Sequence, residues 1–182
     1  MVWIIVIAIV VFIILWVIAT QNKLVRKRMK AENAFADIDV HLVKRYDLIP
    51  NIVNTVKGYA KHEKETLEGV INARNKAVSA GSVDDKINAD NEVTEAISRL
   101  FALTESYPEL KANTNFLSLQ EDLKNVENEL AGARKYYNAA ARDYNYAIAA
   151  IPDCIVAKFF HHNSMNMFSA SEEQRKNVKV EF

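Results

Sequence analysis

The sequence has few of the residues that interrupt helices, form cross-links or bind nucleic acids. It contains 4 glycines and 3 prolines in 182 residues, so turn signals are scarce and a few long helices are favoured. Its one cysteine, Cys154, has no second cysteine for an internal disulfide, which suits a reducing compartment. The formal net charge is zero, so we expect no nucleic-acid partner. No apolar–polar alternation typical of strands occurs, and these absences together predict an all-α fold.

The spacings typical of catalytic and metal sites are also missing. The stretch HEKET at 62–66 has Thr66 where a zinc-protease helix needs its second histidine. His161 and His162 are adjacent, and neighbours on a helix point about 100° apart, so they are poorly placed to share a metal ion. No Glu-x-x-His pair, Gly-rich phosphate loop or Gly-x-Ser-x-Gly elbow occurs. We therefore predict no catalytic residue, no metal ligand, no cofactor and no enzymatic activity.

One long apolar run is present at the start of the chain. The 18 residues VWIIVIAIVVFIILWVIA, 2–19, carry no charge, and as a helix they extend about 27 Å, close to the thickness of a bilayer core. Trp3 and Trp16 lie near its two ends, where indoles prefer the membrane interface. Residues 1–20 are therefore predicted to form a transmembrane helix. A cleaved signal peptide is the alternative, with Ala19 as a cleavage position, although the run lacks a basic leader and is longer than usual.

A basic segment, residues 21–34, follows the apolar run and predicts its orientation. Five cationic residues precede the first acid, Glu32: Lys23, Arg26, Lys27, Arg28 and Lys30. Positive charge stays on the cytoplasmic side of a membrane. We therefore expect a single-pass protein of the cell (inner) membrane with its N-terminus outside and its C-terminal domain in the cytoplasm.

Residues 35–168 read as one helical bundle. Apolar residues at spacings of three and four predict a first helix from about Lys23 to Ser79, with Arg45 in one of the apolar slots. SAGS at 79–82 ends this helix, with Gly81 as a left-handed cap, and Ser82 with Asp85 starts a second helix over 83–106. A third helix, capped by Thr114 or Asn115, is predicted from its seam of Phe116, Leu119, Leu123, Val126, Leu130, Ala133, Tyr137, Ala140, Tyr144, Ala147 and Ile151. This regular seam indicates coiled-coil-like packing.

The segment KRYDLIPNIVNTVKGY, 44–59, predicts a helix with two different faces. Pro50 either kinks this helix or restarts it. On a helical wheel a polar stripe lies opposite the apolar residues, and it consists of Asp47, Asn51, Asn54 and Gly58. Three interpretations are open: a solvated face, a face that sets register against a second stripe, or a catalytic face. That second stripe, on the third helix, consists of Arg134, Asn138, Arg142 and Asn145; Asp47 would pair with one of its arginines.

The end of the chain divides into an apolar piece and a charged tail, residues 169–182. Pro152 closes the third helix, and DCIVAKFF and HHNSMNMF follow it. Part of this piece must cap the bundle end, and whatever is exposed is a docking surface, because aromatic residues and methionine suit such surfaces. Its interaction residues are predicted to be Phe159, Phe160 and Phe168.

Several stretches resemble the LemA family of bacterial membrane proteins: DIDVHLVKRYDLIPNIVNTVKGYAKHEKETLE, ARNKA, ESYPELKANTNFLSLQEDL, ENELAGARKYYNAA and YNYAI. The resemblance covers nearly the whole chain and departs at the end, where FFHHNSMNMF replaces a Phe-Gly-Phe-like piece and Asn177 replaces a proline. It implies an elongated, antiparallel bundle of four helices behind a membrane anchor, with no established enzymatic activity and no cofactor. Genes of the family often lie beside those of HtpX-type membrane zinc proteases or of small membrane-associated modules of unknown role.

Taken together, these features predict a membrane-anchored scaffold or adaptor. The expected partners are the lipid bilayer and another membrane protein, of which an HtpX-type protease is the one that the resemblance suggests. A homo-oligomer is also compatible with the sequence. The alternative is a lipid-surface or membrane-organising protein without a fixed protein partner, because the basic segment suits anionic headgroups.

Overall fold

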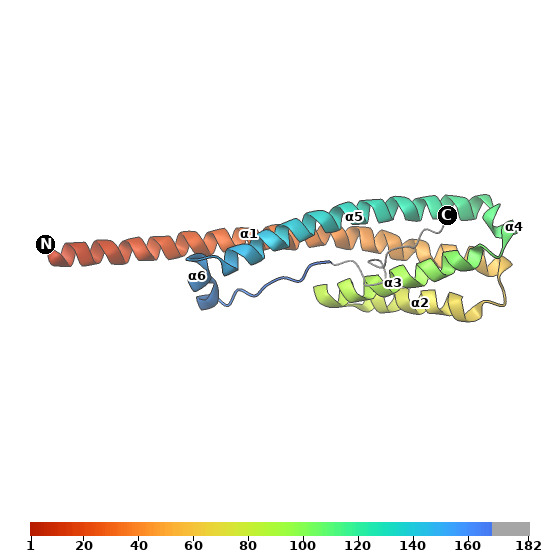
Figure 1. Ribbon diagram of the computed structural model, residues 1–182, viewed down its shortest axis with the longest axis horizontal. Coiled ribbons are helices and arrows are strands. Elements are labelled where there is room, and N and C mark those ends of the chain that lie inside the picture. The colour runs from red at the N-terminus through yellow and green to blue at the C-terminus, as the bar shows by residue number, and fades with distance from the viewer. Residues whose placement is uncertain (169–182) are drawn as a thin grey trace, which may run out of the picture. The chain divides into compact units, whose positions relative to one another are not determined.

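The fold was obtained as a computed structural model, and it describes residues 1–168; the predicted charged tail, 169–182, lies outside the described residues. No strand occurs in the described part, so the predicted all-α helical bundle is confirmed. Figure 1 labels the helices, which are α1 Val2–Tyr59, α2 Lys64–Ser79, α3 Val83–Thr104, α4 Pro108–Lys111, α5 Thr114–Ala149 and α6 Asp153–Phe159.

The helices pack as two compact units. Unit 1 consists of Met1–Asp37 and Ala133–Met167, and unit 2 consists of Ile38–Gly132 and, at the end of the described chain, Phe168. The predicted boundaries at residues 20 and 34 follow composition rather than packing, and they stay a prediction.

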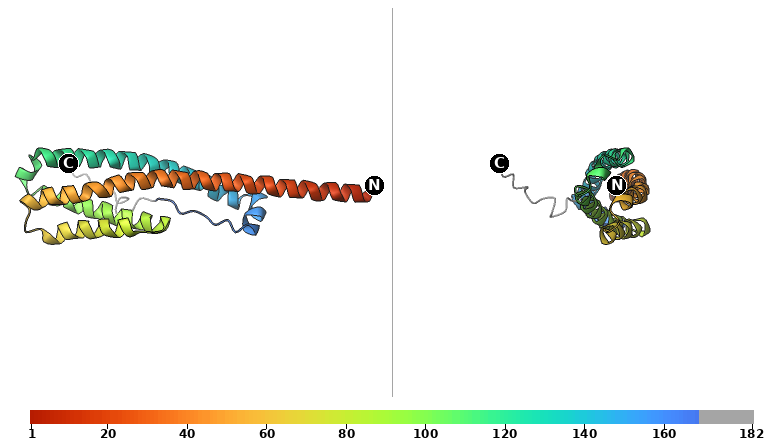
Figure 2. Two further views of the ribbon diagram at one scale, coloured as in Figure 1. Left: turned by 180° about the vertical axis from the view of Figure 1, so that it is seen from behind. Right: turned by 90° about the vertical axis from the view of Figure 1, so that its right-hand side faces the viewer.

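Unit 2 holds the larger core. It contains the second part of α1, all of α2, α3 and α4, and the first part of α5. Figures 1 and 2 show α2 and α3 side by side within it. The apolar residues that the sequence spaces at three and four are buried in this unit, among them Ile38, Leu42, Ile49, Ile52, Val56, Val70, Val93, Leu100, Phe116, Leu123 and Leu130. Their periodicity therefore marks the inner face of each helix.

Unit 1 has a core of its own, which includes the buried rings of Tyr137 and Tyr144. Leu24 of α1, Ala147 of α5 and Ala157 of α6 form a buried cluster, with Ile148 packed against it. Thr20 is the first buried residue of α1, whereas none of the residues before it is buried. After α6, His161 adopts a φ of 56°. An extended segment then runs back along α5 to Met167.

The first predicted helix is wrong in its length. We expected it to reach Ser79, but α1 ends at Tyr59 and α2 begins at Lys64. The amide of Glu63 donates to the carbonyl of Ala60 in the turn between them. Ala60 and Leu67 are both buried, so the apolar spacing continues across the turn even though the helix does not. The apolar spacing indicates which residues face the core. It does not reveal a short turn after which the same positions still face the core.

The observed helix ends confirm one of the predicted caps and contradict two. Ser82 caps α3 as predicted, since its Oγ accepts from the amide of Asp85 at 3.0 Å. The prediction for Gly81 is wrong, because no glycine has a positive φ and Ala80, with φ −64° and ψ 120°, ends α2. The cap of α5 is also not the one predicted: Asn113 Oδ1 accepts from the Phe116 amide at 2.9 Å.

The third predicted helix differs from α5 at its C-terminal end. It was expected to include Ile151, but α5 ends at Ala149, and Ile151 is 87% exposed. The short helix α4 at Pro108 was not predicted, since proline fits the first turn of a helix as well as it ends one. The seam of α5 from Phe116 to Ala147 is otherwise buried or half-buried.

Candidate functional site

The segment with two faces, 44–59, includes Arg45, which is the centre of a buried charge cluster in unit 2. Arg45 and Asp90 each have 1% of their side chain exposed, and Arg45 Nη1 donates to Asp90 Oδ1 at 2.6 Å. Arg45 Nη2 also donates to Thr94 Oγ1 at 3.0 Å. On its third side, Arg45 Nε forms an ion pair of 2.6 Å with Glu127. One guanidinium thus joins α1 to α3 and α5, and its charge is compensated by two carboxylates.

Pro50 leaves a carbonyl of α1 without its helical donor, and a side chain of α2 supplies one. Proline has no amide hydrogen, so the carbonyl of Tyr46 receives no hydrogen bond from position 50. Arg74 Nε donates to this carbonyl at 3.3 Å. Arg74 also lies 3.9 Å from Asp47. The helix α1 continues through Pro50 to Tyr59, so the interpretation in which Pro50 restarts a helix is wrong.

The polar stripe lies on the exposed face of α1. Asp47, Asn51, Asn54 and Gly58 are all exposed, whereas the residues predicted to oppose them are buried: Ile49, Ile52, Val53, Val56 and Ala60. A Cβ atom placed on Gly58 would meet nothing within 4 Å. The ion pair of Asp47 is with Arg74 of α2, a residue that the sequence did not suggest for it. Within residues 1–168 this face of α1 is therefore exposed.

A basic groove adjoins the stripe between α1 and α2. Its volume is about 610 Å³, and Asn54 of the stripe is part of its wall. Three lysines line it, Lys57, Lys61 and Lys64, and the one acid in the lining, Glu68, lies 3.6 Å from Lys64. The apolar residues of its lining are Val53, Leu67 and Ile71. The groove therefore suits an anionic, partly apolar segment of a partner.

The second predicted stripe lies on α5 in unit 1. Arg134 and Asn138 are half-buried, and Arg142 is exposed. Asn145 holds the extended segment by two hydrogen bonds of 2.8 Å, one donated by its Nδ2 to the Met165 carbonyl and one accepted by its Oδ1 from the Met165 amide. The register role that we predicted for the stripe stays a prediction.

His162 connects the extended segment to the start of the basic helix. Its Nδ1 lies 3.0 Å from the Tyr144 hydroxyl and its Nε2 lies 3.0 Å from Gln21 Oε1. Burial, followed by the positive charge of Arg28, lowers the pKa of His162. Burial also raises the pKa of Tyr144, so its hydroxyl stays a hydrogen-bond donor at neutral pH. Among residues 1–168 no three His, Cys, Asp or Glu side chains are grouped to hold a metal ion.

The three predicted phenylalanines differ in exposure. Phe159 and Phe160 are 76% and 43% exposed, and their rings pack edge to face with centroids 5.1 Å apart. Phe168 is half-buried and belongs to unit 2. The first two thus lie on an exposed surface, whereas Phe168 contributes partly to packing.

Comparison with known proteins identifies the same family as the residue pattern. Residues 34–182 match the profile of the LemA family. The chain belongs to the LemA family. Protein LemA of Metamycoplasma hominis is 26% identical over 164 residues, which cover 88% of this LemA family chain and 74% of that protein.

A shorter similarity connects this LemA family chain to magnetosome proteins. Magnetosome protein MamQ of Magnetospirillum gryphiswaldense is 32% identical over 66 residues, and Magnetosome protein MamQ 1 of Paramagnetospirillum magneticum is 33% identical over 66 residues. In both cases the match covers 36% of this chain and 24% of the relative. The likeness is therefore to one part of those proteins.

The sequence carried an unused signal for the buried charge cluster. Arg45 occupies a slot in the apolar repeat of its helix, and Asp90 occupies the slot between Ile87 and Val93. Two opposite charges in apolar slots of two helices indicate a buried pair, because an isolated buried charge is costly. The partnership of Arg74 with the Tyr46 carbonyl has no comparable signal, since it depends on how α2 packs.

Proposed function

We propose that this LemA family protein is a non-enzymatic, single-pass protein of the inner membrane whose helical body holds a second membrane protein. The anchor is the start of α1. Its residues 2–19 are uncharged, and α1 is the one described helix that is long and apolar enough to cross a membrane. No part of its apolar window is buried by protein. A lipid environment would cover these side chains, and the basic residues that follow favour a cytoplasmic body.

The observation that carries the adaptor function is the exposed polar stripe with its basic groove. A helix face that is polar, exposed and bordered by three lysines offers hydrogen bonds and charge to a partner. The buried ion pairs of Arg45 hold this face in place from behind. Because the anchor confines both proteins to one membrane, weak contacts suffice for association. The partner is a membrane protein with an anionic cytoplasmic segment, and an HtpX-type protease is the partner that the family resemblance suggests.

Site-specific photo-cross-linking in cells tests the stripe. A photoreactive amino acid would replace Asn54 in the full-length protein, and in a matched control it would replace Asn91, an exposed asparagine of α3. We expect a specific membrane-protein adduct from position 54 and much less of it from position 91. Asn51→Ala with Lys57→Glu and Lys61→Glu should reduce the yield at position 54 several-fold. Phe168→Ala tests the predicted apolar piece near the C-terminus separately.

Two results would contradict this function. Equal adducts from positions 54 and 91 would remove the stripe as the binding surface. Recovery of no specific membrane protein from any exposed position would refute the adaptor function and favour the lipid-surface alternative. Circular dichroism of the purified variants serves as the control for folding.

Thiol labelling tests the orientation. In a Cys154→Ala background, an Asn91→Cys variant carries one thiol in the helical body. We expect a membrane-impermeant maleimide to label it only after the cells are permeabilised. Ready labelling in intact cells would place the body outside the cytoplasm.

A further inference from the structure

Four large apolar side chains at and around α6 are exposed in unit 1. Ile151 is 87% exposed, Ile155 63%, Phe159 76% and Phe160 43%. The inner side of α6 is already filled by Val156 and Ala157, which are 3% and 2% exposed. Ile155 and Phe159 are four residues apart, so they lie on one face of α6. We call these four exposed residues the α6 apolar patch.

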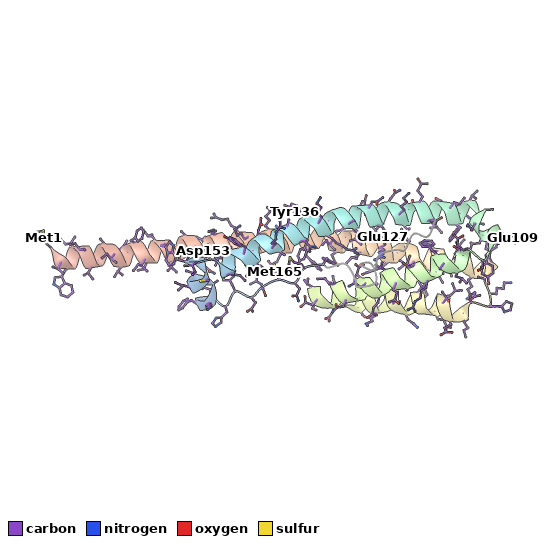
Figure 3. The ribbon with its side chains drawn as sticks, viewed as in Figure 1. Met1, Glu109, Glu127, Tyr136, Asp153 and Met165 are labelled. Atoms are coloured by element: carbon purple, nitrogen blue, oxygen red, sulfur yellow. The ribbon has the colours of Figure 1, made fainter. Side chains whose placement is uncertain are left out.

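The patch lies directly beside the end of the apolar run of α1. Lys23 Nζ is 2.7 Å from Asp153 at the start of α6, and Gln21 Oε1 is 3.0 Å from His162 just after its end. Figure 3 shows Asp153 on α6 next to α1. Leu24 and Ala157 belong to one buried cluster. These contacts hold α6 against residues 21–24 at both of its ends.

Distance along α1 then places α6 at the depth of the lipid headgroups. Lys23 is four residues beyond Ala19, which is about 6 Å along the helix axis. The interfacial region adds roughly 5–8 Å to each side of the hydrocarbon core. If residues 2–19 fill that core, α6 lies within this interfacial layer.

The chemistry of the patch fits that layer. Two phenylalanines and two isoleucines can enter the boundary between headgroups and acyl chains, as the apolar side of an interfacial helix does. Lys158 is exposed on the same short helix, so an ammonium group lies beside the patch, whereas the ammonium group of Lys23 is paired with Asp153. Lysine stems can extend along apolar surface while their charges reach lipid phosphates.

We propose that the α6 apolar patch inserts into the interface of the same membrane leaflet from which α1 emerges, as a second membrane contact. Continuity with the membrane-spanning run identifies the lipid surface as the occupant. The inference rests on the proposed membrane anchoring. With two points of attachment, unit 1 would be fixed in rotation about the anchor, so that a defined side of it faces the membrane.

Lipid quenching of a local fluorophore tests the contact. The full-length Cys154→Ala protein would carry one environment-sensitive NBD label on a cysteine at Phe159, Tyr136 or Phe12. It would be reconstituted in vesicles of phosphatidylcholine and phosphatidylglycerol, with phosphatidylcholine brominated at a shallow or a deep acyl position as the quencher. Circular dichroism would verify the helical content of each variant.

Position 136 is the matched control. Tyr136 is an aromatic residue of the same unit and is 53% exposed. Its ring lies 5.7 Å from Lys30 Nζ. Lys30 is about 16 Å beyond Ala19 along α1, which is outside the interfacial layer. Phe12, 71% exposed within the apolar run, reports on the anchoring itself.

We expect a blue-shifted emission at position 159 and quenching by the shallow bromolipid that is several-fold stronger than at position 136. Quenching at position 12 with none at position 159 would overturn the inference and leave the anchoring intact. A blue shift at position 159 without lipid quenching would also overturn it, since a second copy or another protein would then cover the patch. Absence of quenching at position 12 would refute the anchoring and the inference with it.

Discussion

Arg45 holds a full charge inside unit 2, where 1% of its side chain is exposed. Desolvation of an ion costs several kcal/mol, and only well-placed counter-charges and hydrogen bonds offset this cost. The effect of Arg45 on stability therefore depends on whether all of its polar groups are paired. Asp90, Thr94 and Glu127 provide them. The cluster therefore fixes one arrangement of α1, α3 and α5.

Removal of Arg45 should destabilise unit 2 strongly. Arg45→Met removes the cation that pairs with the buried Asp90, and we expect the free energy of unfolding to fall by about 3–5 kcal/mol. Thermal and denaturant unfolding of the full-length protein in detergent, followed by circular dichroism, measures the loss. The double variant Arg45→Met with Asp90→Leu should recover most of it, because it removes both charges. A double variant as unstable as the single one would contradict a paired-charge role.

His162 should make the protein less stable in acid. Burial and Arg28 lower its pKa below 6.5, the value expected for the unfolded chain. Between the lowered pKa and 6.5 the unfolded chain binds more protons than the folded one, so the free energy of unfolding rises with pH in this window. The contribution of His162 is thus complete above pH 6.5 and is lost as the pH falls through the window.

Thermal melting at a series of pH values tests this effect. His162→Gln should reduce the fall in melting temperature below pH 6.5, because glutamine does not titrate. His161→Gln is the matched control, since His161 is exposed and lies next in the chain. An identical pH profile for wild type and His162→Gln would show that His162 contributes nothing to acid sensitivity.

At the scale of the helix, α1 is stabilised at Pro50 by a residue of another helix. Proline inside a helix removes one backbone hydrogen bond and crowds the preceding turn. Arg74 of α2 donates to the freed carbonyl of Tyr46 at 3.3 Å. This contact also links α2 to the segment that carries the polar stripe. The integrity of the stripe is therefore coupled to the packing of α2.

A double-mutant cycle between Pro50 and Arg74 measures this coupling. Pro50→Ala restores the amide donor to the Tyr46 carbonyl, so Arg74→Ala should cost less in that background, by about 0.5–1.5 kcal/mol. Denaturant unfolding of the four proteins gives the values. Asp47→Asn is the control for the ion pair, which should contribute little because Asp47 is 70% exposed. Additive effects of Pro50→Ala and Arg74→Ala would mean that Arg74 does not replace the missing donor.

At the scale of the whole molecule, the apolar run and the packed units are structurally independent. None of the residues before Thr20 is buried in the structure, whereas Leu24 is fully buried in unit 1. The run is therefore dispensable for packing, and the few residues after it are not. This difference defines where a truncation should be tolerated.

Two truncations that differ by six residues should behave differently. Deletion of residues 1–19 should leave the melting temperature nearly unchanged and move the protein from the membrane to the soluble fraction. Deletion of residues 1–25 also removes Leu24, which should cost about 2–5 kcal/mol, and it removes the contacts of Gln21 with His162 and of Lys23 with Asp153. Fractionation and melting curves measure both effects. Equal melting temperatures for the two truncations would show that Leu24 does not support unit 1.

The sequence by itself determined the helical class, the apolar run and the inner face of the longer helices. These properties depend on local spacing, and apolar residues repeated every three and four positions indicate the inner face of a helix whatever its length. It also determined the cap at Ser82, since a capping box is made by residues three apart. The two faces of 44–59 were likewise readable from the positions of Asp47 and Ile49.

Only the tertiary structure decided the features that join distant residues. Three such features depend on how the helices pack. They are the pairing of Arg45 with Asp90, the hydrogen bond from Arg74 to the Tyr46 carbonyl, and the position of α6 beside Gln21 and Lys23. The break between α1 and α2 was hidden for the same reason, since a turn that keeps Ala60 and Leu67 in the core leaves the repeat intact. Local patterns specify which residues turn inward, whereas the choice of partner is made by the three-dimensional packing that brings them together.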